Sequence, residues 1–372
     1  MRGINEFRFG VNYVPSKRWW YCWNDFSADE IAEDLDAVAA LGADHIRMMT
    51  LWPYFHPNPT WVSPAHLERL GTVMDLAGER GLDVCIAALC GWLTGFSFRP
   101  FWQKDRDLFT DPAMLEAQDL YFRELAGAAT ARENFLGFDL GNELNCCWWA
   151  RTRAQGDAWS ERMLRLCREL APEAVHVNGV NDGPFFQEVT FSPEGLCRMQ
   201  DIVSLHCWVY FTGALERGGP LDPPSVHLAA AMSALARAYA SDASKPVWVQ
   251  EFGASEEWMD REIIPEFMER TVRSAAASGA RWFTWWCSHD IARHFQVEEL
   301  EYTLGLLTTE NQPKPQAETF RRLAEEYRAL DSQEIDAGYG VGAPPSSPKD
   351  RESTWEWLEA WIEALPPGHP GI

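Results

Sequence analysis

The chain has 372 residues, of which 46% are hydrophobic, and 19 residues are tryptophan. It carries 32 Lys and Arg against 55 Asp and Glu, which gives a formal net charge of -23. Such an acidic surface repels phosphate backbones, so the composition excludes nucleic acid as a partner. The length and the hydrophobic content allow one large core, as in α/β barrels that form single domains of this size.

No apolar leader precedes the first predicted strand, and no run of about 18 apolar residues occurs anywhere. We therefore expect neither a signal peptide nor a membrane span. The nine cysteines lack the pattern of a small secreted disulfide framework and fit reduced thiols. Together these features predict a cytoplasmic protein; no sequence signal indicates its oligomeric state.

Short apolar runs alternate with helical patterns through residue 330. The predicted strands are 7–13, 45–51, 84–90, 135–139, 175–180, 202–208, 246–252 and 281–287. N-cap signals at Ser27, Ser63 and Asp111 start three helices, and further helices cover 158–170, 224–239, 260–278 and 316–330. Most strands are apolar on both faces, which is typical of a parallel sheet covered by helices. Eight such units predict an α/β fold, a (β/α)8 TIM barrel, over residues 1–330.

Residues 331–372 form a predicted C-terminal extension. Gly and Pro dominate 338–345, which indicates a linker. Apolar residues then recur at helical spacing over 353–365: Trp355, Leu358, Trp361, Ile362 and Leu365. This stripe favours a helix packed on the outside of the barrel over a helix that binds a partner.

Two buried strands end in a glutamate. The run from Phe135 to Asp139 leads into Gly141-Asn142-Glu143, and the run from Pro246 ends at Glu251. A carboxylate at a buried strand end needs water or a ligand to solvate it. Reactive groups of a barrel gather at the C-terminal ends of its strands. Two glutamates placed in this way are typical of a glycosidase carboxylate pair.

With these motifs, the chain resembles the family 5 glycoside hydrolases of the large retaining clan, over about residues 7–330. The resemblance implies that Glu143 is the acid/base and Glu251 the nucleophile. It also implies that Asn142 holds the sugar hydroxyl next to the anomeric carbon, and that Arg47 supports the nucleophile. A close carboxylate pair can keep one member ionised and the other protonated, which hydrolysis with retention requires.

Several further residues complete the predicted substrate-binding set: His206, Tyr210, Trp285, Trp286, Trp92, His289 and Asp290. Many relatives have a Tyr two residues after the strand-six His, where this chain has Trp208, so Tyr210 is a candidate substitute. Strand alternation separates Trp285 from Trp286, and counting from the strand start favours Trp285 as the floor of the sugar site.

No metal or cofactor is predicted. Cys146 and Cys147 are adjacent and lack the spacing of a zinc pair. His289 and His294 are five residues apart, off the one-face spacing of a helical zinc motif. His289 and Asp290 are therefore better explained as loop residues near the sugar.

A finer resemblance concerns the segments 9–16 and 44–53, which are similar to an intracellular branch of exo-acting β-mannosidases. That branch splits mannosyl-β-1,4-N-acetylglucosamine, a small oligosaccharide. The aromatic loops 17–26 and 91–109 could close one end of the cleft into a pocket. They could instead line an open groove of an endo-β-1,4-glucanase or mannanase. A sugar-binding barrel without catalysis is the third alternative, and retention of both glutamates argues against it.

Overall fold

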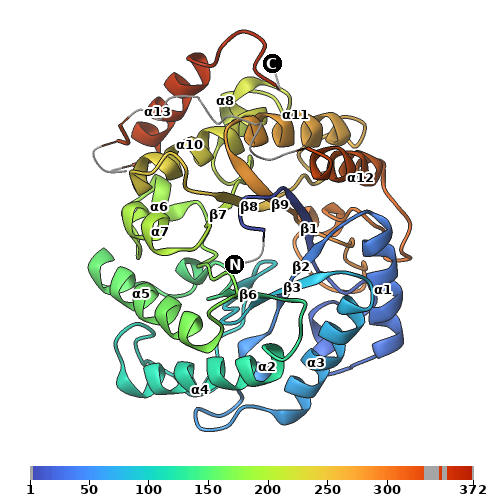
Figure 1. Cartoon of the computed structure of the whole chain (residues 1–372), viewed down its shortest axis with the longest axis vertical. Coiled ribbons are helices and arrows are strands. Elements are labelled where there is room, and N and C mark those ends of the chain that lie inside the picture. Colours follow the sequence, from blue (N-terminus) through green and yellow to red (C-terminus); the bar gives the residue numbers. More distant parts are fainter. Residues whose placement is uncertain (1–2, 331–342, 346–349, 371–372) are drawn as a thin grey trace.

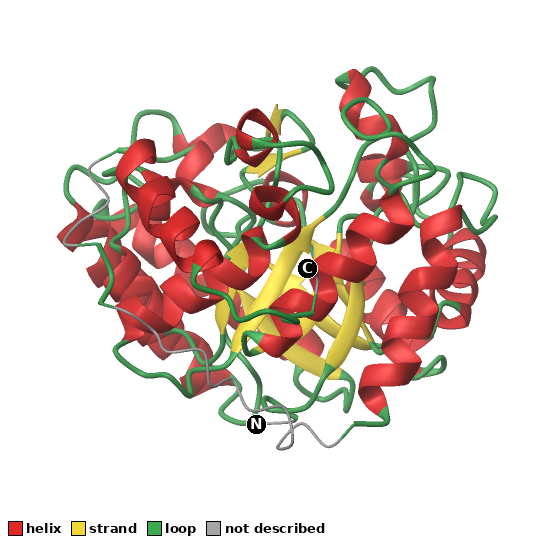
Figure 2. Cartoon of the chain, turned by 90° about the horizontal axis from the view of Figure 1, so that it is seen from above, coloured by secondary structure: helices red, strands yellow, loops and turns green. Residues whose placement is uncertain are grey.

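The computed structural model describes residues 3–330, 343–345 and 350–370. Seven parallel strands form one curled sheet in the order β6-β3-β2-β1-β9-β8-β7. Helices surround the sheet, as Figures 1 and 2 show. The strands are β1 (Arg8–Asn12), β2 (His45–Met49), β3 (Asp83–Ala87), β6 (Phe135–Asp139), β7 (Val203–His206), β8 (Val247–Phe252) and β9 (Ala280–Trp285). Their burial on both faces explains the near-continuous apolar runs in the sequence.

The predicted strand 175–180 is the one unit without a regular strand. Its backbone is bridged to β6 only at Val177, although the amides of Val175 and Val177 both donate to β6 carbonyls at 2.9 and 3.0 Å. On the other side, the amide of Asp201 donates to the carbonyl of His176 at 3.2 Å. The segment therefore occupies the strand position between β6 and β7 and completes the eight strand positions of a (β/α)8 barrel.

The helices begin where the sequence placed their caps. The Ser27, Ser63 and Asp111 side chains accept from backbone amides in the first turns of α1, α3 and α4. The long helices are α1 (Ala28–Ala40), α3 (Pro64–Gly78), α4 (Pro112–Ala129), α5 (Arg153–Leu170), α10 (Leu228–Ala240), α11 (Ile264–Ala277) and α12 (Pro315–Arg328). The short helices are α2 (Trp52–Phe55), α6 (Gly183–Phe186), α7 (Pro193–Met199), α8 (Ala214–Arg217) and α9 (Pro223–Val226).

Irregular segments carry most of the aromatic residues beyond the strands. They include the hairpin of β4 (Trp92–Leu93) and β5 (Phe96–Ser97) and the 3-10 helices at Trp19–Trp23, Phe101–Gln103, Leu144–Cys146 and Glu299–Thr303. Loops on a rigid barrel are the usual place for binding residues, because the scaffold positions them.

The C-terminal extension contributes α13 (Arg351–Glu363), which lies against α10 and α6 (Figure 1). Its Trp355 and Leu358 are fully buried, as the apolar stripe indicated. The predicted linker at 338–345 falls mostly outside the described residues. The division of the chain at residue 330 therefore stays a prediction.

All nine cysteine thiols are free. Among the described helices, none is both long and apolar enough to span a bilayer.

Gly137 in β6 offers a test of how the barrel closes. Its φ is 155°, and a Cβ there would lie 1.7 Å from the carbonyl oxygen of Val175. We expect Gly137→Ala to lower the free energy of unfolding by about 3 kcal/mol or more, because β6 and the 175–180 segment must separate. Urea unfolding measures this loss.

Gly127→Ala is the matched control, because Gly127 lies in α4 and a Cβ there meets no atom within 4 Å. This change should stabilise the chain by about 0.5–1 kcal/mol. Equal effects of the two substitutions would contradict the close approach at Gly137.

Candidate active site

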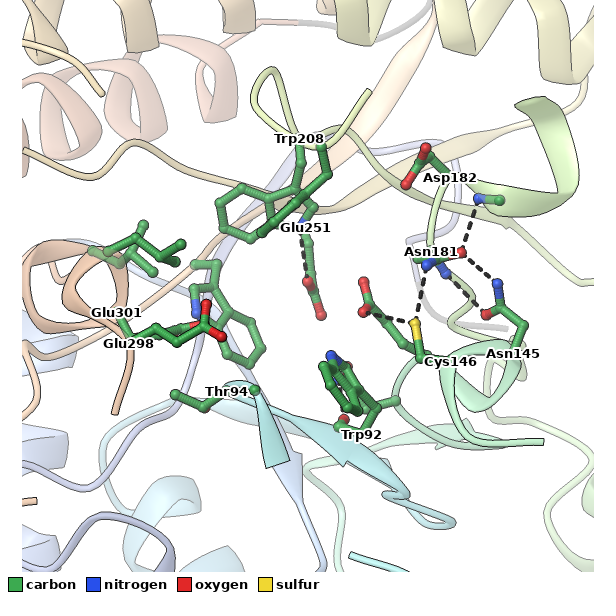
Figure 3. Close-up of a pocket in the computed structure, with 18 of the residues that line it drawn as sticks. Trp92, Thr94, Asn145, Cys146, Asn181, Asp182, Trp208, Glu251, Glu298 and Glu301 are labelled. Carbon is green, nitrogen blue, oxygen red and sulfur yellow. Dashed lines mark hydrogen bonds between the residues drawn. The ribbon is translucent and has the colours of Figure 1, made fainter. Parts of the chain in front are cut away.

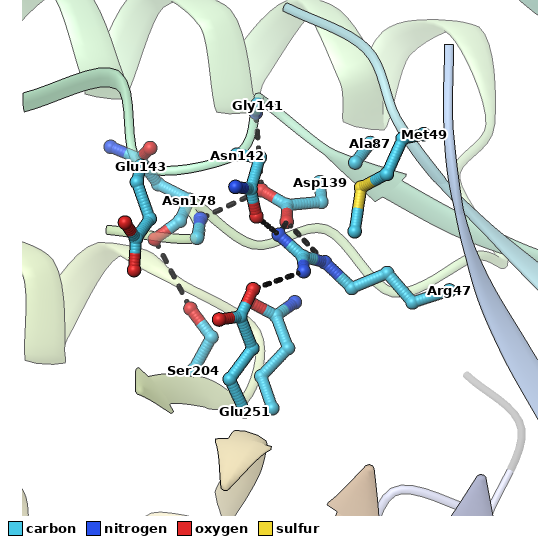
Figure 4. Close-up of polar contacts among 12 residues, drawn as sticks. Arg47, Met49, Ala87, Asp139, Gly141, Asn142, Glu143, Asn178, Ser204 and Glu251 are labelled. Atoms are coloured by element: carbon cyan, nitrogen blue, oxygen red, sulfur yellow. Dashed lines mark hydrogen bonds and ion pairs between the residues drawn. The ribbon is translucent and has the colours of Figure 1, made fainter. Parts of the chain in front are cut away.

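The ends of four strands bring the predicted polar residues together (Figure 4). Arg47 lies in β2, His206 ends β7, Glu251 lies in β8, and Glu143 follows β6 by four residues. All but Glu143 are almost fully buried. Buried polar groups of this kind persist only when they pair with one another.

The Arg47 guanidinium is the centre of this network. It donates to Asp139 Oδ2 at 2.9 Å, to Asn142 Oδ1 at 2.7 Å, to Glu251 Oε1 at 2.7 Å and to Asn12 Oδ1 at 2.9 Å. Burial alone would lower the pKa of Arg47, but the carboxylates of Asp139 and Glu251 outweigh it and raise the pKa. Arg47 therefore stays a cation and fixes the position of one Glu251 oxygen.

Glu143 and Glu251 form a close carboxylate pair with His206 beside them. One carboxylate oxygen from each and a ring nitrogen of His206 all lie within 4.8 Å of one another. Retaining glycosidases place their carboxyl groups about 5–5.5 Å apart, whereas inverting ones need about 6.5–9.5 Å. The spacing leaves no room for a water between the sugar and Glu251, so it suits direct attack by a carboxylate.

His206 links the two carboxylates. Its Nδ1 lies 2.8 Å from Glu143 Oε1 and 3.3 Å from Glu251 Oε2. Burial would lower the pKa of His206, but the charges of Glu251 and Glu143 raise it overall. Burial raises the pKa of Glu251 overall, although the His206 and Arg47 charges oppose the rise. The protonation of His206 and that of Glu251 are therefore linked through the charges of the two side chains.

The backbone at Glu143 is held in a left-handed conformation, with φ 46° and ψ 48°. This costs a non-glycine residue about 1–3 kcal/mol and is found where the surrounding structure fixes it. Here the Glu143 amide donates to the carbonyl of Gly179 at 2.7 Å. The turn directs the Glu143 side chain toward Glu251 instead of along the strand.

Trp208 completes the contacts of Glu251, with its indole Nε1 donating to Oε2 at 3.2 Å. Both oxygens of Glu251 thus accept from a donor that cannot be an acceptor, Arg47 on one and Trp208 on the other. Such bonds favour the ionised carboxylate that a nucleophile needs.

A cavity of about 460 Å³ opens above this pair. Figure 3 shows Cys146, Asn181 and Asp182 along one side, and Thr94, Glu298 and Glu301 along the opposite side. Glu251 lies between these two sides. Glu143 and Trp286 also line the cavity. Further residues of the wall are Trp92, Gly95, Asn142, Asn145, Trp149, Gly183, Gln187, Val189, Trp208, Phe211, Trp258, Leu300, Leu304 and Arg351.

Three aromatic loops meet at the Thr94 side of the cavity. The Trp19 ring contacts Phe96 of the β4–β5 hairpin at 5.6 Å and Phe295 at 5.3 Å between centroids. The indole of Trp20 donates to Thr94 Oγ1 at 3.0 Å. These contacts join the loop after β1, the hairpin and the loop after β9. The hairpin lines the cavity with Thr94 and Gly95, and the loop after β9 lines it with Glu298, Leu300 and Glu301.

Two aromatic residues of the predicted sugar site do not line the cavity. Trp285 is fully buried and donates its Nε1 to the carbonyl of Leu304, so Trp286 and not Trp285 lines the cavity. Tyr210 is 48% exposed and stacks at 4.8 Å on Trp258 of the cavity wall, but does not itself line the cavity. The position beside Glu251 that was considered for Tyr210 belongs to Trp208.

His289 and Asp290 also lie outside the cavity wall. His289 is fully buried between the carbonyl of Val14 and the side chain of Asn311. Asp290 pairs with Lys314 at 2.9 Å. Both residues contact other segments of the chain around the loop after β9, and neither lines the cavity.

Arg47 and His206 lie behind the glutamates and contact the carboxylates, not the cavity. Trp92 and Asn142 do line it, and the Asn142 amide donates to the carbonyl of Trp92 at 2.8 Å. This bond fixes the amide whose oxygen accepts from Arg47.

Sequence reasoning missed a second set of polar residues in the wall. The Cys146 thiol lies 3.7 Å from Glu143 Oε2 and accepts from the Asn181 amide at 3.0 Å. Asp182 is 7% exposed. These residues sit in loops without regular periodicity, so only proximity to Glu143 along the chain could have indicated Cys146. The remaining members are Glu298, Glu301 and Arg351.

Glu143, His206 and Glu251 are also close enough to ligate a cation. The Arg47 guanidinium, 2.7 Å from Glu251, would repel such an ion. The donor set therefore fits proton transfer better than metal binding.

The cellulase family model, glycosyl hydrolase family 5, matches residues 4–290 of this chain. No curated protein matches the chain at a significant level. Among solved structures, the chain is similar to a GH5_18 variant from Streptomyces cattleya in complex with Manβ1-4GlcNAc. The two share 35% identity, with a TM-score of 0.87, over 96% of this chain and 91% of the other.

A GH5_18 variant from Bifidobacterium longum subsp. longum ATCC 55813, also in complex with Manβ1-4GlcNAc, is 29% identical. Its TM-score is 0.86, over 96% of this chain and 89% of the other. An exo-β-1,4-mannosidase from Opitutaceae bacterium strain TAV5 is 27% identical, with a TM-score of 0.77, over 89% of this chain and 60% of the other. The chain belongs to glycoside hydrolase family 5 and is a retaining β-glycosidase.

Proposed function

We propose that the chain is an exo-β-mannosidase that removes a terminal mannose from mannosyl-β-1,4-N-acetylglucosamine or similar small β-mannosides. The observation that carries the proposal is the packing of three aromatic loops beside Thr94, at one end of the cavity. We infer that these loops close that end, which then admits one sugar and excludes a continuing chain. The GH5_18 structures with Manβ1-4GlcNAc bound support the choice of sugar.

In the proposed first step, Glu251 attacks the anomeric carbon of the mannose. The bond to the leaving oxygen breaks, and Glu143 gives that oxygen its proton. In the second step Glu143 takes a proton from water, the water oxygen bonds to the anomeric carbon, and Glu251 leaves. Arg47 and Trp208 hold the Glu251 oxygens throughout.

This chemistry orients the substrate. The acid must lie next to the leaving oxygen, so the leaving sugar occupies the Glu143 side with Cys146, Asn181 and Asp182. The mannose then lies against Trp286 and the closed end, where Glu298 and Glu301 can accept from its hydroxyls.

A second candidate, an endo-β-1,4-glucanase or mannanase, needs a cleft open at both ends. An endo-β-1,4-mannanase from Thermotoga petrophila shares the fold at 17% identity. The loop wall beside Thr94 disfavours this alternative. The free thiols are consistent with the proposed cytoplasmic location, where a small oligosaccharide is a suitable substrate.

Product analysis tests the proposed function. On a β-1,4-linked mannooligosaccharide of several units, we expect release of single mannose units in sequence, with the β-anomer formed first, because the closed end holds only the terminal sugar. Chromatography separates the products, and proton NMR identifies the anomer. Early products from the middle of the chain, or faster cleavage of polymer than of disaccharide, would favour the endo-acting alternative.

Azide distinguishes the proposed roles of the two glutamates. In Glu251→Ala, azide can occupy the space of the nucleophile and should give an α-mannosyl azide of inverted configuration. In Glu143→Ala, azide should attack the glycosyl-enzyme from the opposite face and give the β-azide. Without azide, Glu143→Ala should lose about 10²–10⁴-fold on natural sugars. NMR of the two azides measures the outcome, and the same anomer from both variants would refute the assignment.

Glu301 makes folding dependent on pH. Burial raises its pKa to about 8, and the charges of Glu251, Glu298 and Glu143 add to the rise. The unfolded pKa is about 4.3, so the folded chain binds this proton more tightly. The stability that this proton contributes is fully present below the unfolded pKa of about 4.3 and is lost as the pH rises through the folded pKa of about 8.

We therefore expect the free energy of unfolding of the wild type, relative to Glu301→Gln, to fall between pH 5 and pH 8.5. Urea unfolding at the two pH values measures the difference. Glu299→Gln is the control, because Glu299 is exposed, lies in the same 3-10 helix and pairs with Arg293. A difference between wild type and Glu301→Gln that does not change with pH would contradict the raised pKa.

A further inference from the structure

The C-terminal helix α13 places a cation in the wall of the catalytic cavity. Arg351, its first residue, lines the cavity together with Asp182 and Gly183. Its guanidinium lies over Gly213, where a Cβ would meet Nη1 at 3.4 Å. Arg351 lies 100 positions beyond Glu251 in the chain, in the C-terminal extension.

Several contacts hold α13 against the loops that carry the wall. Trp355 donates to the carbonyl of Thr212 at 2.8 Å, and Thr354 donates to the carbonyl of Phe185 at 2.8 Å. Thr212 follows Phe211 of the wall, and Phe185 belongs to α6, whose Gly183 also lines the cavity. Arg217 adds an ion pair to Glu359 at 2.8 Å. The helix is thus a fixed support of the side of the cavity assigned to the leaving sugar.

Arg351 and Asp182 both keep their charged groups available for a ligand in this wall. Within the described part of the chain, the Arg351 guanidinium forms no ion pair at 4.0 Å or less. The Asp182 carboxylate accepts from no side chain there, although it is almost fully buried. Burial and the Glu143 charge raise the pKa of Asp182 to about 6, and the Arg351 charge opposes the rise.

A donor-only group and an acceptor-only group on one wall suit a ligand that offers both an acceptor and a donor. An acetamido group has this character, because its carbonyl oxygen accepts and its N–H donates. A guanidinium and a carboxylate can satisfy the two at once with charge-assisted bonds. A plain hydroxyl must accept from the guanidinium and donate to the carboxylate at one oxygen, whereas an acetamido group separates its acceptor from its donor.

We propose that Arg351 of the C-terminal helix and Asp182 select a leaving sugar that carries an acetamido group. The guanidinium donates to the carbonyl oxygen, and the carboxylate accepts from the amide N–H. The inference rests on the proposed function, in which that sugar is N-acetylglucosamine. It makes the C-terminal extension a part of the active site and Arg351 a specificity-determining residue.

The test compares mannosyl-β-1,4-N-acetylglucosamine with mannosyl-β-1,4-mannose. In Arg351→Gln, the ratio of kcat/KM for the two substrates should fall about 10–100-fold, the loss expected for a hydrogen bond to a charged group. The fall should come mainly through KM, because the leaving sugar is bound before the bond breaks. Arg351→Lys keeps the charge and should recover part of the ratio.

Glu356→Gln is the matched control, because Glu356 is exposed on the same helix and lies outside the cavity wall. It should leave the ratio unchanged. An unchanged ratio in Arg351→Gln, or an equal loss on both substrates, would overturn the inference.

Calorimetry with free N-acetylglucosamine provides a measurement that needs no turnover. Its Kd should rise about 10-fold or more in Arg351→Gln and in Asp182→Asn, whereas the Kd of glucose should change less. This measurement tests Arg351 and Asp182 even if the wild-type chain hydrolyses no β-mannoside. That result would overturn only the proposed function. Equal changes in Kd for both sugars would refute the acetamido contact.

Discussion

The buried guanidinium of Arg47 is the constraint on which the site depends. A fully buried cation without counter-charges would cost several kcal/mol, so Asp139 and Glu251 must lie next to it. Those two residues belong to β6 and β8, on opposite sides of β2 in the sheet order. One side chain therefore fixes the relative position of three strands and of the proposed nucleophile, before any substrate contributes.

Close backbone approaches make this arrangement possible. A Cβ at Gly179 would lie 2.4 Å from Asp139 Oδ2 and 2.9 Å from Arg47 Nη2, so only glycine fits there. The carbonyl of Gly179 also accepts the amide of Glu143, which holds the left-handed turn. The segment 175–180 lacks regular strand pairing. Its Gly179 leaves the space in which the Asp139 and Arg47 side chains approach each other. This irregular segment lies beside Glu143, the proposed acid.

The strand and helix pattern and the positions of Glu143 and Glu251 could be predicted, because burial of both strand faces and a carboxylate at a strand end leave a local signal. The choice between Trp285 and Trp286 could not. It depended on alternation from the strand start, and β9 begins at Ala280 and changes register against β8. Each such irregularity reverses which face a side chain takes. Likewise, the aromatic donor to Glu251 is the indole N–H of Trp208, and the sequence pattern did not separate Trp208 from Tyr210.

The position of Arg351 at the cavity could not be predicted from the sequence either. Nothing in the apolar stripe of α13 indicates that its first turn reaches the cavity, because that contact depends on where Trp355 docks. The parts of the site differ in origin: strand ends supply the carboxylates, whereas loops and the C-terminal helix supply the two ends of the cavity. Chemistry that depends on 4.8 Å spacing needs the rigid barrel. Substrate choice needs only a wall of suitable charge, so it can be built from segments that the barrel does not constrain.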